Sequence, residues 1–388
     1  MKGSAIFRIV AVVGLSAVVG LAQNPTRRAQ EFFAQGVERQ RKGDLAGASQ
    51  AYEEAHRLAP RRVDVLSNLG LVFSQMGEHD RAIQCFHDAL KVDLNQPIVR
   101  FNLGLAYMQT GRFEPAQVEF DRVLKIQPTN LAAHHLRGLC LLKLGRLEDG
   151  IKELETVRHA RPADSDLACT LASVYIKLNQ LDKAEPIVHD LEKLDSAEAH
   201  FIVGSYYLEK LDHRRAVKEL TRTLEQNPRF PDAHAQLAYA YFFEFKWDLS
   251  VKMCEEELAI DPDDDNAVKL LGSLYRQRGR LEEAEALLDK AARQNPNDYE
   301  ILYQIGLLDV AKDDYSRAVD ILEKVTQLNP DFPPAHITLV RTYGKLKRSA
   351  DAQREQAIVN RLNAERKNQP TVRDKALYDA FKVPEQSR

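Results

Sequence analysis

The apolar positions of this chain follow helical spacing, and the pattern repeats at a fixed interval along most of the sequence. Glycines mark the interval at Gly36, Gly70, Gly104 and Gly138, and later at Gly204, Gly272 and Gly306. Self-similarity at a fixed period is typical of repeat architectures, in which each unit packs only against its neighbours. We therefore expect the chain to be built by stacking small units, without one large core.

Each repeat is predicted to contain two antiparallel helices. A small residue lies early in the second helix and a bulky apolar residue follows four positions later, as at Ala82 and Phe86. The small residue lets two helices approach closely, and the bulky residue fills the gap that remains. Proline ends many repeats, as at Pro128, because it has no amide hydrogen with which to continue a helix. Five glycines lie between the two helices, where a left-handed residue commonly ends the first helix: Gly43, Gly77, Gly111, Gly145 and Gly279.

The run Phe101-Asn102-Leu103-Gly104-Leu105-Ala106-Tyr107, followed by Ala116, Phe120 and Pro128, resembles the tetratricopeptide repeat family. The resemblance covers residues 29 to about 362 as ten units, which begin near Ala29, Val63, Pro97, Leu131, Ser165, Ala197, Pro231, Asp265, Tyr299 and Pro333. It implies an all-α fold, a right-handed superhelical solenoid of about ten antiparallel helix pairs. It also implies a concave face that is lined mainly by the first helix of each pair.

The repeats suggest four segments along the chain. Residues 1–22 are interpreted as a signal peptide, 29–196 as units one to five, 197–367 as units six to ten with a C-terminal capping helix, and 368–388 as a polar flexible tail. The fifth unit is irregular, because its terminal loop is two residues short and Pro186 lies inside its second helix. We expect the superhelical path to change at this unit.

The segment 1–22 has the organisation of a secretory signal. Lys2 and Arg8 give a positive start, Ile9–Leu21 is an uncharged apolar run, and Ala22 is a small residue suited to signal peptidase. The apolar run is shorter than the about 20 residues of a membrane span, and an uncleaved membrane anchor is the alternative. The mature protein is thus expected to be exported, periplasmic or secreted, and to have no stable membrane span.

The composition of the chain limits which classes of molecule it is expected to bind. The apolar share is 44% and the charged share 29%, as in soluble folded proteins. The net charge is −3, and it becomes −5 once the signal segment with Lys2 and Arg8 is removed, so no basic excess favours nucleic acid. The cysteines are irregularly spaced and lie at or beside packing positions on helices, which favours buried free thiols over a disulfide framework. They are Cys85, Cys140, Cys169 and Cys254.

The sequence contains no phosphate-binding glycine loop, HExxH motif or nucleophile elbow, so we predict no catalytic residue, cofactor or metal. His134, His200, His234 and His336 occupy one place in their units, and the layers of the stack separate them. This spacing favours packing roles over metal ligation. The acidic run 261–265 lacks the glycine and glutamate of a calcium loop, and we interpret it as a loop that caps the next helix.

Apolar residues on the expected concave face form the candidate partner-binding site. They are Phe33, Val37, Leu71, Phe101, Leu105, Met108, Leu139, Leu142, Tyr239, Phe242 and Phe243. Apolar side chains on an open face suit a partner groove, but the same spacing also suits the core between the helices. In the seventh unit, helical spacing directs Tyr241 and Phe245 towards the core.

The leading hypothesis is a non-catalytic scaffold in a bacterial-type cell envelope, which binds segments of other proteins or peptides along its concave groove. One alternative is a structural repeat protein that associates with itself through its end units, and the oligomeric state is left open. The other is an enzyme with an unrecognised groove site, since one fold hosts many functions.

The signal peptide predicts cleavage after Ala22 in the native host. The intact mass of protein purified from its native host is the measurement, and the expected N-terminus is Gln23. A mature protein that begins at Met1 would contradict both the cleavage and the predicted compartment.

Overall fold

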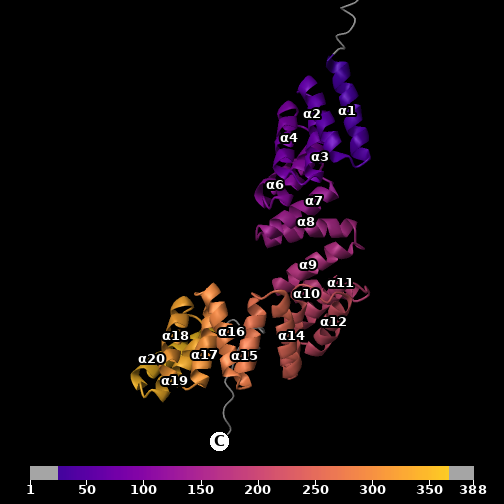
Figure 1. Ribbon diagram of the computed structural model, residues 1–388. Helices are drawn as coiled ribbons and strands as arrows, with labels where there is room; N and C mark the ends of the chain where they lie inside the picture. Colours follow the sequence, from indigo (N-terminus) through magenta and orange to yellow (C-terminus); the bar gives the residue numbers. More distant parts are fainter. Residues whose placement is uncertain (1–24, 367–388) are drawn as a thin grey trace, which may run out of the picture. The chain divides into compact units, whose positions relative to one another are not determined.

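The computed structural model describes residues 25–366, and these residues form α-helices joined by short turns (Figure 1). Within this range there are twenty helices and no strand, which confirms the predicted all-α fold of helix pairs. The two helices of a pair pack against each other, as α1 does against α2 and α17 against α18. The predicted signal peptide, 1–22, and the predicted tail, 368–388, lie outside the described residues.

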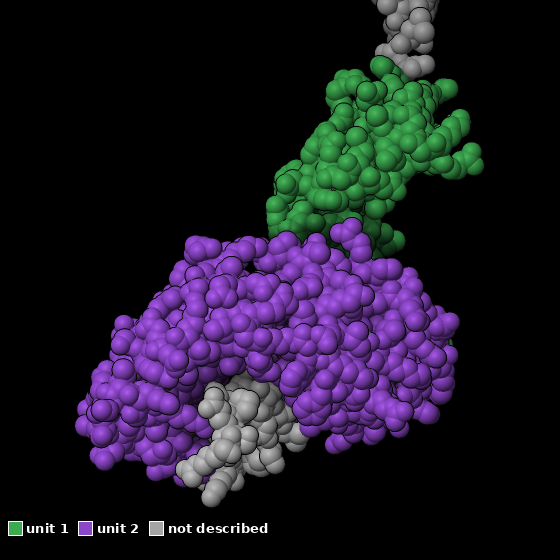
Figure 2. All heavy atoms as spheres, turned by 60° about the horizontal axis from the view of Figure 1, so that its bottom comes forward, with its two compact units in different colours: residues 1–167 green, residues 168–388 purple. Residues whose placement is uncertain are grey.

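The chain divides into two compact units, the first ending at Leu167 and the second beginning at Ala168 (Figure 2). Unit 1 contains α1 (Pro25–Arg41), α2 (Leu45–Leu58), α3 (Val63–Gln75), α4 (His79–Val92), α5 (Pro97–Gln109), α6 (Phe113–Ile126), α7 (Leu131–Lys143) and α8 (Leu147–Ala160). The boundary falls within α9 (Ser165–Lys177). Unit 2 continues with α10 (Leu181–Leu191), α11 (Ala197–Glu209), α12 (His213–Gln226), α13 (Ala233–Phe243), α14 (Trp247–Ile260), α15 (Asp265–Gln277), α16 (Leu281–Gln294), α17 (Tyr299–Ala311), α18 (Tyr315–Leu328), α19 (Pro333–Lys345) and α20 (Ser349–Arg366). Among these helices, none combines the length and the apolar character that a membrane crossing requires.

The first helices begin where the repeat register predicts. Eight of the ten start at the predicted residue, among them α3 at Val63 and α5 at Pro97. The helix α1 begins four residues early, at Pro25, and α13 begins two residues late, at Ala233. The delay at α13 has a local cause, because the backbone of Asp232 is left-handed, with φ of 61°, and cannot continue a right-handed helix.

A left-handed residue follows the first helix of each described pair. The predicted glycines take this conformation with φ between 72° and 81°: Gly43, Gly77, Gly111, Gly145 and Gly279. In the other five pairs the same place holds Asn179, Leu211, Phe245, Asp313 and Lys347, with φ between 54° and 61°. The prediction that Phe245 lies in the core is wrong, because α13 ends at Phe243 and the Phe245 side chain is 80% exposed in the turn.

In several pairs, a glycine on the first helix lies directly against a bulky side chain on the second helix. A Cβ atom added to Gly36 would lie 2.6 Å from the ring of Tyr52, and one added to Gly70 would lie 2.7 Å from the ring of Phe86. Both aromatic side chains are fully buried. Because these distances are shorter than any normal van der Waals contact, the packing requires a residue without Cβ.

A polar pair, buried or half-buried, joins the two helices of several pairs at one register. In α5 and α6, the Arg100 guanidinium donates to the Glu119 carboxylate at 2.8 Å. Three other pairs have histidine in place of arginine, with Nδ1 lying 2.6–2.7 Å from a glutamate oxygen: His134–Glu153, His200–Glu219 and His336–Glu355. A buried polar group is costly unless it is hydrogen-bonded, so these contacts fix how the two helices face each other.

Three of the cysteines, Cys85, Cys140 and Cys254, are free thiols in the structure, as predicted. Burial raises the pKa of both Cys85 and Cys140 to about 11. The thiolate, which is the reactive form, is therefore scarce at neutral pH.

We expect Gly70→Ala to destabilise the array by about 1–3 kcal/mol, since the new Cβ would overlap the buried Phe86 ring. The melting temperature followed by far-ultraviolet circular dichroism measures the effect. Gly344→Ala in α19 is the matched control, because a Cβ added there meets nothing within 4 Å. Alanine should stabilise that helix position by up to about 1 kcal/mol, so equal responses of the two variants would contradict the packing argument.

Candidate functional site

The first helices of successive pairs lie side by side and carry the candidate binding face. In unit 1, α3 contacts α5, and in unit 2 the same holds for α11 with α13, α13 with α15, α15 with α17 and α17 with α19. The second helices contact one another less, so the first helices are the more closely spaced set. In a curved stack the closely spaced elements form the inner side, and the surface of unit 2 is hollowed in Figure 2.

Four apolar residues at one register form what we term the apolar row of unit 1. Val37, Leu71, Leu105 and Leu139 are each one repeat apart and lie on α1, α3, α5 and α7. Val37 is 44% exposed, and the three leucines are half-buried. Single exposed apolar residues are ordinary on a protein surface. The row repeats one partly exposed apolar position on four successive first helices, and Leu71 also packs on the buried cluster that contains Phe86.

Phe33 and Phe101 share another register, and each faces the second helix of its own pair. The ring of Phe33 lies 5.7 Å from that of Tyr52, and the Arg62 guanidinium lies 4.9 Å from the centre of the Phe33 ring. The ring of Phe101 lies 5.6 Å from that of Phe120, edge to face. Since Tyr52 and Phe120 are fully buried, the two half-buried phenylalanines belong partly to the core and partly to the surface.

Met108 and Leu142 share a third register, on the side of the first helix that faces its partner. A Cβ added to Gly150 of α8 would lie 2.7 Å from Leu142 Cδ2, which places the Leu142 side chain against the second helix. Met108 packs on the buried cluster that contains Phe120. Both residues are half-buried and contribute to contacts within or between pairs.

The three predicted aromatic residues of α13 form one half-buried cluster. The ring of Phe243 lies 5.4 Å from that of Phe242 and 6.2 Å from that of Tyr239. Phe243 also stacks on His213 of α12, with ring centres 4.6 Å apart and an interplanar angle of 10°. Burial lowers the pKa of His213, which favours a neutral ring in this apolar setting.

Sequence reasoning missed an exposed apolar patch at the junction of α13 and α14. Phe245 in the turn is 80% exposed, and Trp247 and Leu249 at the start of α14 are 41% and 43% exposed. The repeat register contained the signal, because Phe245 lies one repeat before Gly279, the left-handed turn residue of the next pair. Comparison with that register would have placed Phe245 in the turn.

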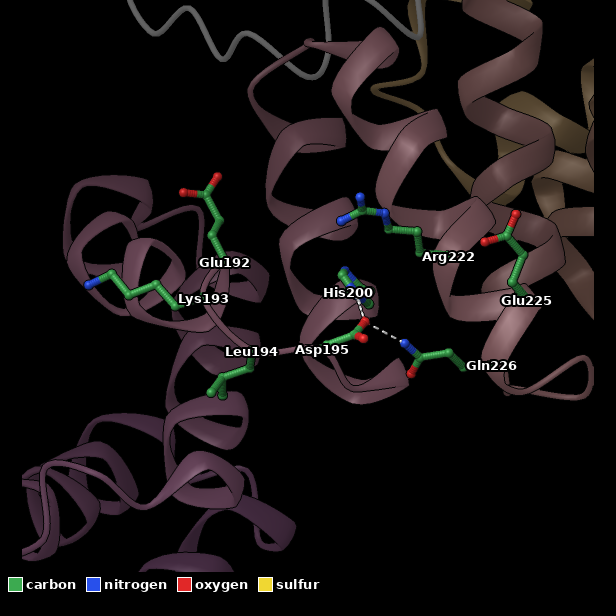
Figure 3. A pocket seen from close by; sticks show the side chains of 8 residues that line it. All are labelled: Glu192, Lys193, Leu194, Asp195, His200, Arg222, Glu225 and Gln226. Carbon is green, nitrogen blue, oxygen red and sulfur yellow. Dashed lines mark hydrogen bonds and ion pairs between the residues drawn. The ribbon is translucent and has the colours of Figure 1, made fainter.

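A polar cleft lies beside the shortened connection between α10 and α11 (Figure 3). Its lining residues are Glu192, Lys193, Leu194, Asp195, His200, Arg222, Glu225 and Gln226. One Asp195 oxygen lies 3.1 Å from His200 Nε2 and accepts a hydrogen bond from Gln226 Nε2 at 2.7 Å. The hydrogen bond with His200 holds the pKa of Asp195 below its usual value. These contacts tie the short loop to α11 and α12, which indicates a structural role for the cleft.

Two family models described as tetratricopeptide repeat match this chain. One matches residues 74–140, 244–304 and 309–375, and the other matches residues 33–84. Together they cover more than half of the sequence.

Known proteins are similar over parts of the chain. The type IV pilus assembly protein PilF of Pseudomonas aeruginosa is 25% identical over 150 residues, which are 38% of this chain and 60% of that protein. Anaphase-promoting complex subunit 3 of Schizosaccharomyces pombe is 23% identical over 134 residues, which are 34% of this chain and 20% of that protein. The matches thus span less than two thirds of either relative. The crystal structure of the APC/C hetero-tetramer Cut9–Hcn1 is 15% identical with a TM-score of 0.48, and the match covers 88% of this chain and 89% of that one.

We expect Phe101→Ala to lower the free energy of unfolding by about 2 kcal/mol, because the ring packs on the buried Phe120. Val37→Ala, at the exposed end of the apolar row, should change it by less than about 0.5 kcal/mol. Urea unfolding followed by circular dichroism measures both. An unchanged stability of Phe101→Ala would show that Phe101 belongs to the open face alone.

Proposed function

This chain belongs to the tetratricopeptide repeat family, and we propose that it is a non-catalytic scaffold that binds segments of other proteins. Proteins of this family typically bind other proteins. The observation that carries the proposal is the apolar row of unit 1, which repeats one partly exposed apolar position on four first helices. The partner would lie across these helices, with one contact for each pair that it crosses.

The apolar row would supply binding free energy through burial. Removing apolar surface from water contributes about 25 cal/mol for each Å², and a central anchor typically accounts for about 2 kcal/mol, or about thirtyfold in affinity. Leu71 and Leu105 lie on contacting helices, α3 and α5, and are the central members of the row. An amphipathic helix or an extended segment with regularly spaced apolar side chains fits a surface of this kind.

The proposed location is outside the cytoplasm, periplasmic or secreted. It is supported by the order of charged, apolar and small residues in positions 1–22. The similarity to a protein named for type IV pilus assembly also supports an envelope setting. The acidic balance of the mature chain supports proteins, and not nucleic acids, as partners.

The test compares capture of partners with stability in the same variant. We expect Leu105→Asp to lose partners that the unaltered mature protein retains from an envelope extract, because a charge in the middle of the apolar row would have to be desolvated. Its melting temperature should fall far less than that of a variant with aspartate at a core leucine, since Leu105 is half-buried and Leu103, the core leucine of α5, is fully buried. Quantitative mass spectrometry of the retained proteins and circular dichroism are the two measurements.

Leu103→Asp is the matched control, because Leu103 lies two residues away on α5 and is fully buried. It should unfold the surrounding pairs, as expected for a core position. If Leu105→Asp unfolds the array in the same way, the apolar row belongs to the core. If Leu105→Asp folds and retains every partner, the binding face lies elsewhere.

A further inference from the structure

The helix α17 in unit 2 is buried on every side. Residues 301–309 of this helix are all buried. A run of this length makes more than two turns of an α-helix, so its side chains point in all directions from the axis. The buried positions therefore include the side of α17 that corresponds to the candidate binding face. In α3 and α5 of unit 1, that side is half-buried.

Three residues of α17 show this difference at individual registers. Leu307 lies at the register of the apolar row and is 1% exposed, whereas Val37 is 44% exposed. Tyr303 is buried at the register where Phe101 is half-buried, and the adjacent Gln304 is buried as well. The same kind of surface that is partly open in unit 1 is thus closed on α17.

The closed surface continues onto α15, which lies beside α17 (Figure 1). Two residues of α15 are at the registers of Gln304 and Leu307, and both are buried. We use the term covered face for these two residues together with the three of α17. The covered face consists of Leu270, Ser273, Tyr303, Gln304 and Leu307.

Neighbouring first helices do not by themselves explain the burial of this face. The helix α13 has a first helix on each side, α11 and α15, just as α17 has α15 and α19. The α13 residues at the registers of Gln304 and Leu307 are Gln236 and Tyr239, and both are half-buried. The comparison indicates that a further segment of the chain covers α15 and α17.

Two buried polar atoms at this place have no hydrogen-bond partner, Gln304 Oε1 and Arg276 Nε. Arg276 follows Ser273 by one turn on α15, so the two residues lie on the same side of that helix. Among residues 25–366, no carboxylate forms an ion pair with Arg276, and burial lowers the pKa of its guanidinium. Because unpaired buried polar atoms are costly, the covering segment should supply a hydrogen-bond donor to Gln304 and a carboxylate to Arg276.

The segment that follows α20, residues 367–388, has the side chains that this surface requires. Leu377, Tyr378 and Phe381 are at positions i, i+1 and i+4, which is the spacing of one apolar side of a helix. A carboxylate, that of Asp379, lies between them in the sequence. The segment carries five basic and three acidic side chains, a net charge of +2, whereas the rest of the mature chain carries −7. Opposite net charges favour the association of the two.

The segment is also long enough to return to the covered face. The helix α20 packs on α19, and α19 contacts α17. Ten residues, 367–376, separate the end of α20 at Arg366 from Leu377. Fully extended, they span at most about 33–36 Å, whereas packed helix axes are about 8–10 Å apart. Leu377 can therefore reach α17 without any movement of the helices.

We propose that residues 367–388 bind the covered face within the same molecule. The apolar residues of the segment would pack on α15 and α17, and one of its carboxylates would pair with Arg276. The chain itself would then occupy this part of unit 2, and a partner that binds there would have to displace the segment. The apolar row of unit 1 is not involved, so the inference does not depend on what binds to that row.

The test measures whether the segment shields the covered face in the full chain. Ser273→Cys places a thiol on this face with little change in side-chain size. Its alkylation by iodoacetamide is followed by peptide mass spectrometry, which distinguishes it from the native cysteines. We expect Leu377→Asp combined with Phe381→Asp to accelerate this alkylation about tenfold or more, because a buried thiol reacts only when its cover is open.

Ser205→Cys is the matched control, because Ser205 lies at the register of Ser273 on α11, outside the covered face. Its alkylation rate should be the same with and without the two aspartates. Helical circular dichroism should also be unchanged, so that faster alkylation of Ser273→Cys reports an opened face and not unfolding. The proposal would be overturned by an alkylation rate at Ser273→Cys that the two aspartates leave unchanged. Equal acceleration at Ser205→Cys would overturn it too, because it would show a general loosening of unit 2.

Discussion

The close contact between a small residue on one helix and a bulky side chain on the next is the constraint on which the rest of this structure depends. At Gly36 and Gly70 the space for a Cβ atom is already occupied by the rings of Tyr52 and Phe86. The same contact recurs once in most repeats. Equivalent residues therefore return at one register on successive first helices, and the apolar row of unit 1 depends on this register.

Buried polar pairs add orientation to this apolar contact. The Arg100–Glu119 pair and its histidine counterparts join the first and second helices at one register, where each polar group finds a partner. The pair formed by α13 and α14 departs from these rules at several places at once. Its first helix begins late, its turn residue is an exposed phenylalanine, and the buried carboxylate of Glu257 stands at a position that is apolar in most other pairs. This carboxylate accepts the Ala235 amide at 3.1 Å and so supports the late start of α13.

On the candidate binding face, the same side chain can pack against the second helix of its pair and still be partly exposed to solvent. Phe101 and Leu142 contact the second helices of their pairs, yet both remain partly exposed. Val37, the first member of the apolar row, is 44% exposed, whereas Leu71 packs on the buried cluster of unit 1. Since first helices pack against their neighbours as well as their partners, a half-buried apolar residue on them is expected even without a ligand. The partner-binding role therefore depends on the shared register of the row, and less on the exposure of any one member.

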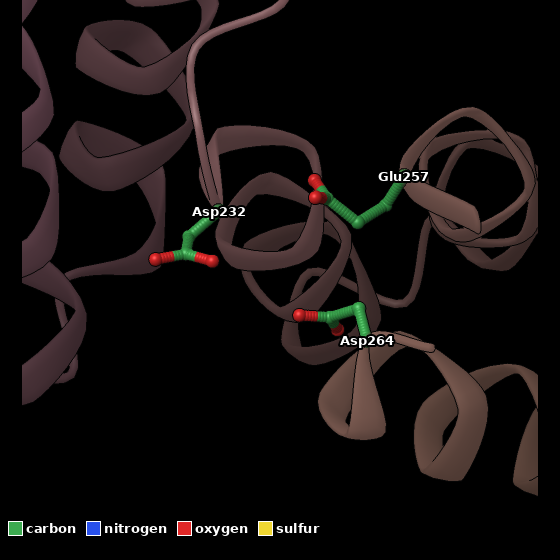
Figure 4. Close-up of side chains that lie close together, drawn as sticks. All are labelled: Asp232, Glu257 and Asp264. Atoms are coloured by element: carbon green, nitrogen blue, oxygen red, sulfur yellow. The ribbon is translucent and has the colours of Figure 1, made fainter. Parts of the chain in front are cut away.

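The sequence by itself determined the repeat, because its period, small-residue contacts and left-handed turns all arise from interactions between residues close in the chain. It located the starts of helices such as α3 and α5 to the residue. It could not decide which apolar side chains on a first helix remain open, since helical spacing is the same for core and groove. It also gave no sign that Glu257 lies beside Asp232 and Asp264 (Figure 4), because the three side chains come from separate elements. Only the packing of α13, α14 and α15 decided that juxtaposition, since it brings the Glu257 carboxylate to the start of α13, where the Ala235 amide donates to it.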